Sequence, residues 1–250
     1  MSDGPVFELR GVGRRYGETT ALEGVDLAVE PGERIGLIGP SGAGKTTLLS
    51  LLNATRSPTS GRLLIFGQDP TELAPERRRR LQSRIGTIHQ QFHLVDGLRV
   101  IHNVNAGRLA EWSLLRSLWS LIRPRETDRA RRILERVGIG EKLYERTGDL
   151  SGGEKQRVAL SRVLAQDPDV ILADEPIASL DRENSREVMD LLSRLAREEG
   201  VTAVISLHEY EYALSHCERV IGLRGGRVLF DRPAGEVSEE LIDRLYRLER

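Results

Sequence analysis

The chain has 250 residues, enough for one large α/β domain or two small ones. Its 37 lysines and arginines nearly balance 38 aspartates and glutamates, so composition gives no general attraction to nucleic acid. The single cysteine, Cys217, excludes an internal disulfide and fits a reducing compartment, and we expect it to be a buried small apolar side chain without chemistry.

No apolar run in the sequence reaches the roughly 18 to 20 residues that span a bilayer. The start of the sequence, Met1 to Val6, has no basic region followed by an apolar one, so we expect no secretory leader. A role at a membrane would therefore have to come through a partner.

Three short segments with partial alternation predict a small antiparallel sheet in the first part of the chain. They run from Val6 to Arg10, from Leu22 to Glu30 and from Arg62 to Phe66, with turn residues between them. Tyr16 lies just before a turn and could stack on a purine, although ordinary packing is the commoner role of a single aromatic ring.

The strongest motif is a glycine-rich loop that follows a short apolar run and leads into a leucine-rich helical pattern. It fits the phosphate-binding pattern G-x-x-x-x-G-K-[ST] at every position. Gly39, Gly42 and Gly44 let the backbone turn sharply and point N–H groups at a phosphate. Lys45 then reaches the β and γ phosphates, and Thr46 ligates Mg²⁺. The candidate nucleotide-binding residues of this loop are Gly39, Pro40, Ser41, Gly42, Ala43, Gly44, Lys45, Thr46 and Thr47.

A basic helix and a buried strand are expected next. The helix runs from Thr71 to Arg84, and its arginine run, Arg77 to Arg80, is more typical of a solvated face than of a nucleic-acid patch. The strand runs from Ile85 to Gln90. Gln90 at its carboxyl end lies where α/β sheets place ligands, although this signal is weak by itself.

Residues 93–148 have a different pattern, which predicts a helical lobe inserted into the α/β core. Both tryptophans, Trp112 and Trp119, fall on one wide apolar face of a helix. This face could rest on a membrane surface, but it is too short to cross one, so packing within the lobe or against a protein partner is favoured. A second helix should stop at Gly138.

A second candidate anion site lies at the start of a helix, at Leu150 to Glu154. Ser151 and Glu154 fit a capping box, which by itself explains a well-started helix. The pair Gly152 and Gly153 is not needed for a cap and costs about 1 kcal/mol per residue in helix propensity relative to alanine. Bare backbone at a helix N-terminus binds anions, so the pair favours a binding role.

Two acidic residues follow the next apolar strand, which runs from Asp169 to Ala173. Asp174 at a strand end can hold Mg²⁺ through its water shell, and the neighbouring Glu175 can orient or deprotonate a water molecule. Such pairs are common in loops, but the position after a phosphate-binding loop favours function. A further strand, from Val201 to Ser206, leads to His208.

The rest of the chain reads as ordinary α/β structure. A helix after Asp181 should stop at Gly200, and two later strands form a hairpin that turns at Gly225 and Gly226. An amphipathic helix begins near Ser238.

In this order, the motifs resemble those of the ATP-binding subunits of ABC transporters over essentially the whole chain. Tyr16 matches the adenine-stacking aromatic, Gly39 to Thr47 the Walker A loop, and Gln90 the Q-loop. Farther along, Leu150 to Glu154 match the signature, and Asp174 with Glu175 the Walker B pair. Ala178 to Asp181 match the D-loop, and His208 matches the switch histidine.

The resemblance implies an α/β fold. It has a P-loop NTPase core that is RecA-like with a mostly parallel sheet, an antiparallel β subdomain and an inserted α-helical subdomain. Residues 1–250 would form a single ABC ATPase domain. Residues 1–92 and 149–250 would be its nucleotide-binding core, and residues 93–148 its helical subdomain with the signature helix at its end.

The resemblance also implies ATP and Mg²⁺ as cofactors. The catalytic residues would be Glu175, which polarises the attacking water, His208, which contacts the γ-phosphate, and Gln90, which senses nucleotide and metal. The metal would be held by Thr46, Gln90 and Asp174.

The implied partners are a second copy of the chain and the permease subunits of a membrane transporter, and through these a solute-binding protein, but no nucleic acid. In a head-to-tail dimer, the signature of one copy faces the ATP on the Walker A loop of the other, next to the D-loops. The residues concerned are Ser151, Gly152, Gly153 and Glu154 of the signature, and Ser179 and Asp181 of the D-loop. The chain would lie on the cytoplasmic face of the membrane, where Gln90 to Leu98 and the lobe around Trp112 and Trp119 would form a groove for a permease helix.

Within this family, the chain looks most like phosphonate-importer ATPases. The likeness lies in Val170 to Asp181, with Ile177 where many relatives have threonine, in Leu207 to Arg219, and in Arg116 to Pro124. It implies that the chain powers import of phosphonates or related phosphorus oxyanions through ATP-driven dimer closure. Because this subunit does not touch the transported molecule, an importer for another small solute and a soluble ABC-type ATPase without a transporter remain alternatives.

Overall fold

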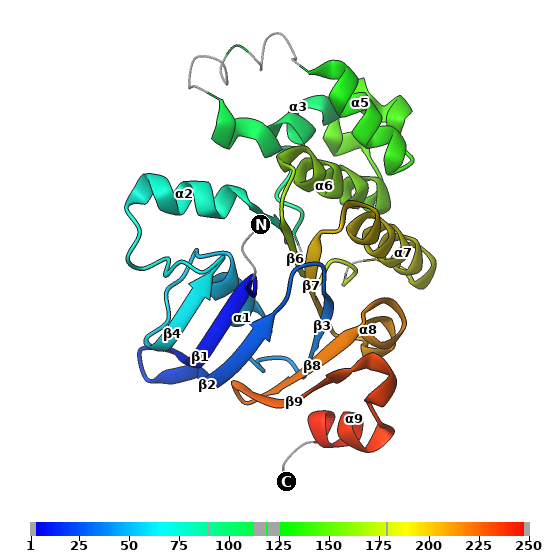
Figure 1. Cartoon of the computed structure of the whole chain (residues 1–250). Coiled ribbons are helices and arrows are strands. Elements are labelled where there is room, and N and C mark those ends of the chain that lie inside the picture. The colour runs from blue at the N-terminus through cyan, green and yellow to red at the C-terminus, as the bar shows by residue number, and fades with distance from the viewer. Residues whose placement is uncertain (1–3, 90, 113–118, 120–125, 179, 248–250) are drawn as a thin grey trace.

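Two β-sheets and the helices around them make up the computed structural model of the chain (Figure 1). The structure describes residues 4–89, 91–112, 119, 126–178 and 180–247. Within these ranges, every helix is too short or too polar to cross a membrane.

The smaller sheet has three antiparallel strands in the order β2-β1-β4. Its strands are β1 Phe7–Tyr16, β2 Thr19–Val29 and β4 Ser60–Ile65. The sheet was predicted, but β1 continues well past Arg10. Gly11 has a left-handed φ of 57°, and the register shifts between Leu9 and Val12. These irregularities interrupt the alternation of apolar and polar residues by which a strand is recognised in a sequence.

The larger sheet has six strands in the order β5-β6-β7-β3-β8-β9. All its neighbouring strands are parallel except β8 and β9, which form the predicted hairpin. Its strands are β3 Arg34–Ile38, β5 Ile85–Ile88, β6 Val170–Asp174, β7 Thr202–Leu207, β8 Arg219–Arg224 and β9 Arg227–Pro233. The mostly parallel sheet, the antiparallel sheet and the helices confirm the predicted fold class.

The helices connect these strands, and α3, α5 and α6 lie at the end of the molecule farthest from the hairpin, whereas α8 and α9 lie beside it (Figure 1). The α-helices are α1 Lys45–Leu52, α2 Pro75–Ser83, α3 Val100–Asn105, α5 Thr127–Arg136, α6 Gly152–Gln166, α7 Arg182–Glu199, α8 Tyr210–His216 and α9 Glu239–Tyr246. Short 3₁₀ helices are η1 Ala106–Glu111, η2 Gly140–Tyr144, η3 Thr147–Asp149 and η4 Ala234–Glu236.

Helix α2 begins at Pro75, not at Thr71 as predicted. The Asp69 carboxylate accepts a hydrogen bond from the backbone N–H of Thr71 at 2.9 Å. This bond stabilises a non-helical turn where the first turn of the helix was expected. Ala74, which precedes the proline, is extended at ψ 150°, as the proline ring requires. The proline then occupies the first helical position, where its missing N–H costs no helical hydrogen bond.

The helical lobe contains α3, η1 and α5, which pack against α6 (Figure 1). Helix α5 ends just before Gly138, whose φ is 78°, as the glycine predicted. The two tryptophans have opposite environments, since Trp112 is only 7% exposed whereas Trp119 is 61% exposed. The prediction that both anchor a partner is therefore wrong for Trp112, which is part of the packed interior. The segment between them, residues 113–118, lies outside the described residues.

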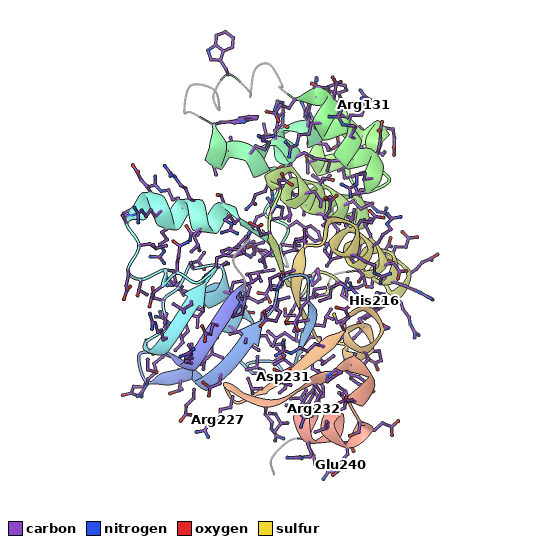
Figure 2. The ribbon with its side chains drawn as sticks, in the orientation of Figure 1. Arg131, His216, Arg227, Asp231, Arg232 and Glu240 are labelled. Carbon is purple, nitrogen blue, oxygen red and sulfur yellow. The ribbon has the colours of Figure 1, made fainter. Side chains whose placement is uncertain are left out.

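Side chains from the sheets and from the surrounding helices fill the space between them (Figure 2). Cys217 belongs to this core and is buried, as predicted. Burial raises the pKa of its thiol to about 12. The thiol therefore keeps its proton and behaves as a small apolar side chain.

Candidate functional site

The phosphate-binding loop lies between β3 and α1 and is pressed against neighbouring backbone. Gly39 has a φ of 151°, and a Cβ there would lie 2.1 Å from the carbonyl oxygen of Leu223. Gly44 has a φ of 105°, and its Cβ would lie 2.6 Å from the carbonyl oxygen of Ala21. Only glycine fits these two positions, because a side chain would both strain the backbone and collide with it.

Lys45 is the first residue of α1, and its side chain is buried under the loop, with 5% of the residue exposed. Its Nζ donates to the carbonyl oxygens of Gly39 at 2.8 Å and Pro40 at 3.3 Å. Burial lowers the pKa of this ammonium group, and the carboxylates of Glu175 and Asp174 oppose the shift. A cation held inside a loop of backbone N–H groups is suited to bind the phosphates of a nucleotide.

Asp174 ends β6 directly opposite the start of α1. Its Oδ1 accepts hydrogen bonds from Thr46 Oγ1 at 3.3 Å and from Ser206 Oγ at 2.7 Å. A hydroxyl and a carboxylate are the oxygen ligands that Mg²⁺ prefers, so the donor set fits this ion. Among the described residues, no group of three or more His, Cys, Asp or Glu side chains could hold a metal alone. A metal here would need phosphate oxygens and water to complete its coordination.

Glu175 and His208 form the second half of the site. Nε2 of His208 lies 2.6 Å from Oε1 of Glu175. Glu175 has a left-handed φ of 51°, and its N–H donates to both the carbonyl oxygen and the Oγ of Ser206, at 3.2 and 2.9 Å. This backbone turn places the carboxylate beside His208, just beyond the carboxyl end of β7. A carboxylate and an imidazole in contact next to a phosphate site can handle the proton of an attacking water.

Ser206 was missed in the sequence, although it touches both acidic residues. Its Oγ donates to Asp174 and accepts from the Glu175 N–H. The sequence signal was a hydroxyl at the end of an otherwise apolar strand, two residues before His208.

Tyr16 ends β1, and its ring is 41% exposed. The guanidinium carbon of Arg14 lies 4.6 Å from the ring centroid. The pKa of the Tyr16 hydroxyl is lowered, because burial raises it less than the side chains of Arg14, Thr47 and Ser50 together lower it. The structure thus brings Tyr16 to the helix that follows the phosphate-binding loop. An aromatic ring in this place is suited to contact a nucleotide base.

The capping box at the start of α6 is present. Glu154 N–H donates to Ser151 Oγ at 3.3 Å, and Ser151 N–H donates to Glu154 Oε2 at 2.8 Å. A Cβ on Gly153 would lie 3.1 Å from Oδ1 of Asn184, so the start of α6 lies close to the start of α7. Asp181 caps α7 by accepting the N–H of Asn184 at 3.0 Å.

The structure does not bring every predicted site residue together. In the described part of the chain, no hydrogen bond or ion pair joins the signature, Ser151 to Glu154, to the phosphate-binding loop. Two predicted site residues, Gln90 and Ser179, lie outside the described residues.

A hollow of about 800 Å³ lies between α2, β5, η1 and α6, next to the segment that follows Gln90. Its charged lining includes Arg79, Arg80 and Arg162. Arg162 donates to the carbonyl oxygens of Phe92 at 2.8 Å and His93 at 2.7 Å. This basic hollow therefore contacts the Q-loop segment directly.

The sequence model of the family described as ABC transporter matches residues 22–178. The chain belongs to the ABC transporter family. The matched region contains the phosphate-binding loop, the signature and the acidic pair, whose geometry is described above.

Curated relatives of this ABC transporter chain include phosphonates import ATP-binding proteins from three bacteria. The protein of Pseudomonas syringae pv. syringae is 47% identical over 91% of this chain and 86% of its own length, and that of Pseudomonas putida is 45% identical over 96% and 89%. The protein of Anaeromyxobacter dehalogenans is 46% identical over 99% of this chain, but the chain spans only 49% of that relative's length.

Solved structures of ABC cassettes share the fold. A structure of cbiO1 from Clostridium perfringens, part of the ABC transporter complex cbiONQ, aligns with a TM-score of 0.82 at 28% identity, covering 97% of this chain and 94% of the other. A dimeric structure of the ATP-binding cassette MJ0796 in a post-hydrolysis state bound to ADP and Pi aligns with a TM-score of 0.77 at 30% identity, covering 91% and 98%. The chain is an ABC-type ATPase, as its motifs predict.

Replacing Ser206 with alanine should lower the kcat of ATP hydrolysis by about tenfold, because Asp174 loses one donor and the Glu175 N–H one acceptor. Steady-state ATPase kinetics would measure the change. The matched control is Ser161→Ala, which removes a buried serine hydroxyl that bonds only within α6. Equal kcat values for Ser206→Ala and Ser161→Ala would contradict the role of Ser206.

Proposed function

We propose that this chain is the ATP-hydrolysing subunit of an importer for phosphonates or related phosphorus oxyanions. The observation that carries the substrate class is the identity of 45–47% to phosphonates import ATP-binding proteins over 91–99% of this chain. The part of the proposal that concerns ATP rests on geometry. The carboxyl ends of neighbouring strands bring a buried lysine, two carboxylates and a histidine to one edge of the sheet.

In the proposed mechanism, Lys45 and the loop N–H groups bind the β and γ phosphates. Thr46, Asp174 and Gln90 would hold Mg²⁺, which neutralises charge that develops on the phosphates. Glu175 accepts the proton of the attacking water, and Tyr16 stacks on the adenine.

His208 has two roles in this mechanism. Its Nε2 contacts Glu175, which orients the carboxylate, and we propose that its ring contacts the γ-phosphate. These groups act by position and charge, which is how proteins catalyse most phosphoryl transfer.

We further propose that two copies form a head-to-tail dimer. The signature, Ser151 to Glu154, offers a helix N-terminus and two bare glycines, yet it makes no bond to the phosphate-binding loop of its own copy within the described residues. The ATP bound by a partner copy supplies the missing anion. Ser179 and Asp181 would lie at the contact between the two copies.

The surface that meets the permease is the basic hollow between α2 and α6. Arg79, Arg80 and Arg162 favour an acidic segment of the permease as its occupant. Through this contact the chain would lie on the cytoplasmic face of the membrane and respond to a solute-binding protein.

We also propose that the chain divides into a core, residues 1–92 and 149–250, and a helical subdomain, residues 93–148.

Glu175→Gln should retain ATP binding and lose turnover by at least about a hundredfold, because the amide keeps the shape of the side chain but cannot accept a proton. Nucleotide binding and phosphate release would be measured on the same preparation. Near-normal hydrolysis would remove Glu175 from its role.

The trans action of the signature can be tested with mixed dimers. A Lys45→Ala copy and a Ser151→Arg copy together leave one composite site intact, so mixing them should give ATPase activity above that of either parent. No gain in ATPase activity on mixing would mean that hydrolysis requires both composite sites of the dimer to be intact at once. Full activity from an isolated monomer would contradict the dimer.

The docking surface and the substrate can be tested together in a reconstituted transporter. A phosphonate with its binding protein should raise ATPase activity, and Arg80→Glu should abolish that rise while the KM for ATP stays unchanged. Arg77→Glu is the matched control, since Arg77 is exposed on the same helix but does not line the hollow.

Each part of this proposal has an outcome that would contradict it. Stimulation by amino acids or metal chelates but not by phosphorus oxyanions would overturn the substrate class. Equal stimulation of the Arg80→Glu and wild-type complexes would overturn the docking surface. Failure to co-purify with any permease would favour a soluble ATPase.

A further inference from the structure

The C-terminal helix α9 packs beside α8 and the β8–β9 hairpin (Figure 1). Ile242 and Leu245 are buried, and Ser238 caps the helix through the N–H of Leu241. Arg224, at the end of β8, donates to the carbonyl oxygen of Arg247 at 2.6 Å. Glu240 lies on the outer side of the helix (Figure 2). The helix is therefore fixed to the core at both of its ends.

The last residue of α9, Tyr246, reaches the ATPase site. Its hydroxyl donates to the backbone carbonyl oxygen of His208 at 3.2 Å. Among the described residues, this is the hydrogen bond that the structure provides to that carbonyl. The ring of Tyr246 lies 6.3 Å from that of Tyr210, in a tilted arrangement.

The Tyr246 hydroxyl is suited to remain a donor. Burial raises the pKa of this phenol, and the backbone N–H of Gly39 opposes the shift. The phenol therefore keeps its proton.

The side chain of His208 has little else to hold it. It is 44% exposed, and its contact within the described residues is the 2.6 Å approach to Glu175. The residue stands in a short bend between β7 and α8, outside either element. An exposed ring on a bend is free to take other rotamers unless its backbone is fixed.

We propose that Tyr246 is a positioning residue, which holds the backbone of His208 so that the imidazole faces Glu175. The helix α9, which the sequence marks only as an amphipathic tail, thereby becomes part of the ATPase site. The inference rests on the role of His208 in the proposed function.

The test compares Tyr246→Phe, which removes one hydroxyl and keeps the ring, with two controls. Tyr210→Phe removes the hydroxyl of the neighbouring ring, which does not bond His208. Leu245→Val loosens the packing of α9 but keeps the Tyr246 hydroxyl. ATPase kinetics and thermal unfolding would be measured for all three variants and for His208→Ala.

We expect Tyr246→Phe to lower kcat about three- to tenfold, as loss of one hydrogen bond predicts, with the KM for ATP changed by less than about twofold. Tyr210→Phe should keep the wild-type kcat. Leu245→Val should unfold at a lower temperature and still keep kcat, which separates the positioning of His208 from general stability.

Three distinct outcomes would overturn the inference. A wild-type kcat in Tyr246→Phe together with a large loss in His208→Ala would overturn the role of Tyr246 alone. A wild-type kcat in His208→Ala would remove His208 from the mechanism and this inference with it. A kcat that falls in Leu245→Val as much as in Tyr246→Phe would show that the hydroxyl acts only through stability, which also contradicts the proposal.

Discussion

The parallel pairing of β6, β7 and β3 is the constraint on which the rest of the site depends. Asp174 pairs with Ser206, and Ile38 pairs with Leu207. Parallel strands bring their carboxyl ends to the same edge of a sheet, so three segments far apart in the sequence meet there. The phosphate-binding loop, the acidic pair and His208 each begin at one of these ends. A slip of one residue in either pairing would turn the acidic pair or the histidine away from Lys45.

Backbone strain at the site is offset locally. Glu175 is left-handed at φ 51°, a conformation that costs a non-glycine residue about 1 to 2 kcal/mol. Its N–H is satisfied twice by Ser206, once by the carbonyl and once by the hydroxyl. The same hydroxyl fixes Asp174. Ser206 thus bonds the carboxylate of Asp174 and the backbone of Glu175, while the Asp174 carboxylate contacts Thr46 and the Glu175 carboxylate contacts His208. These different surroundings let neighbouring acidic residues take different roles.

The sequence predicts the features whose signals are local. The loop from Gly39 to Thr47, the capping box at Ser151 and the stop at Gly200 follow from the conformations that these residue types favour. Contacts that depend on how strands far apart in the sequence pair leave no such signal. For this reason the sequence marks Ser206 only as part of a strand. Tyr246 lay in a helix that looked ordinary, because its contact with His208 spans 38 positions of the chain. Periodicity likewise placed Trp112 and Trp119 on one face, but it does not tell which part of that face is covered.

Helix α6 joins the two surfaces that we propose as contacts with other chains. Its first turn carries the signature, and farther along Arg162 bonds the carbonyls of Phe92 and His93 in the basic hollow. At its end, Gln166 donates to the carbonyls of Ser83 and Ile85, at 2.9 and 3.0 Å. A helix transmits displacement along its axis because its backbone hydrogen bonds make it stiff. A shift of the signature toward a nucleotide on a partner copy must therefore either move the Q-loop segment and the end of α2 with it or break these four hydrogen bonds. If these bonds are kept, α6 would connect the proposed closure of the dimer to the hollow.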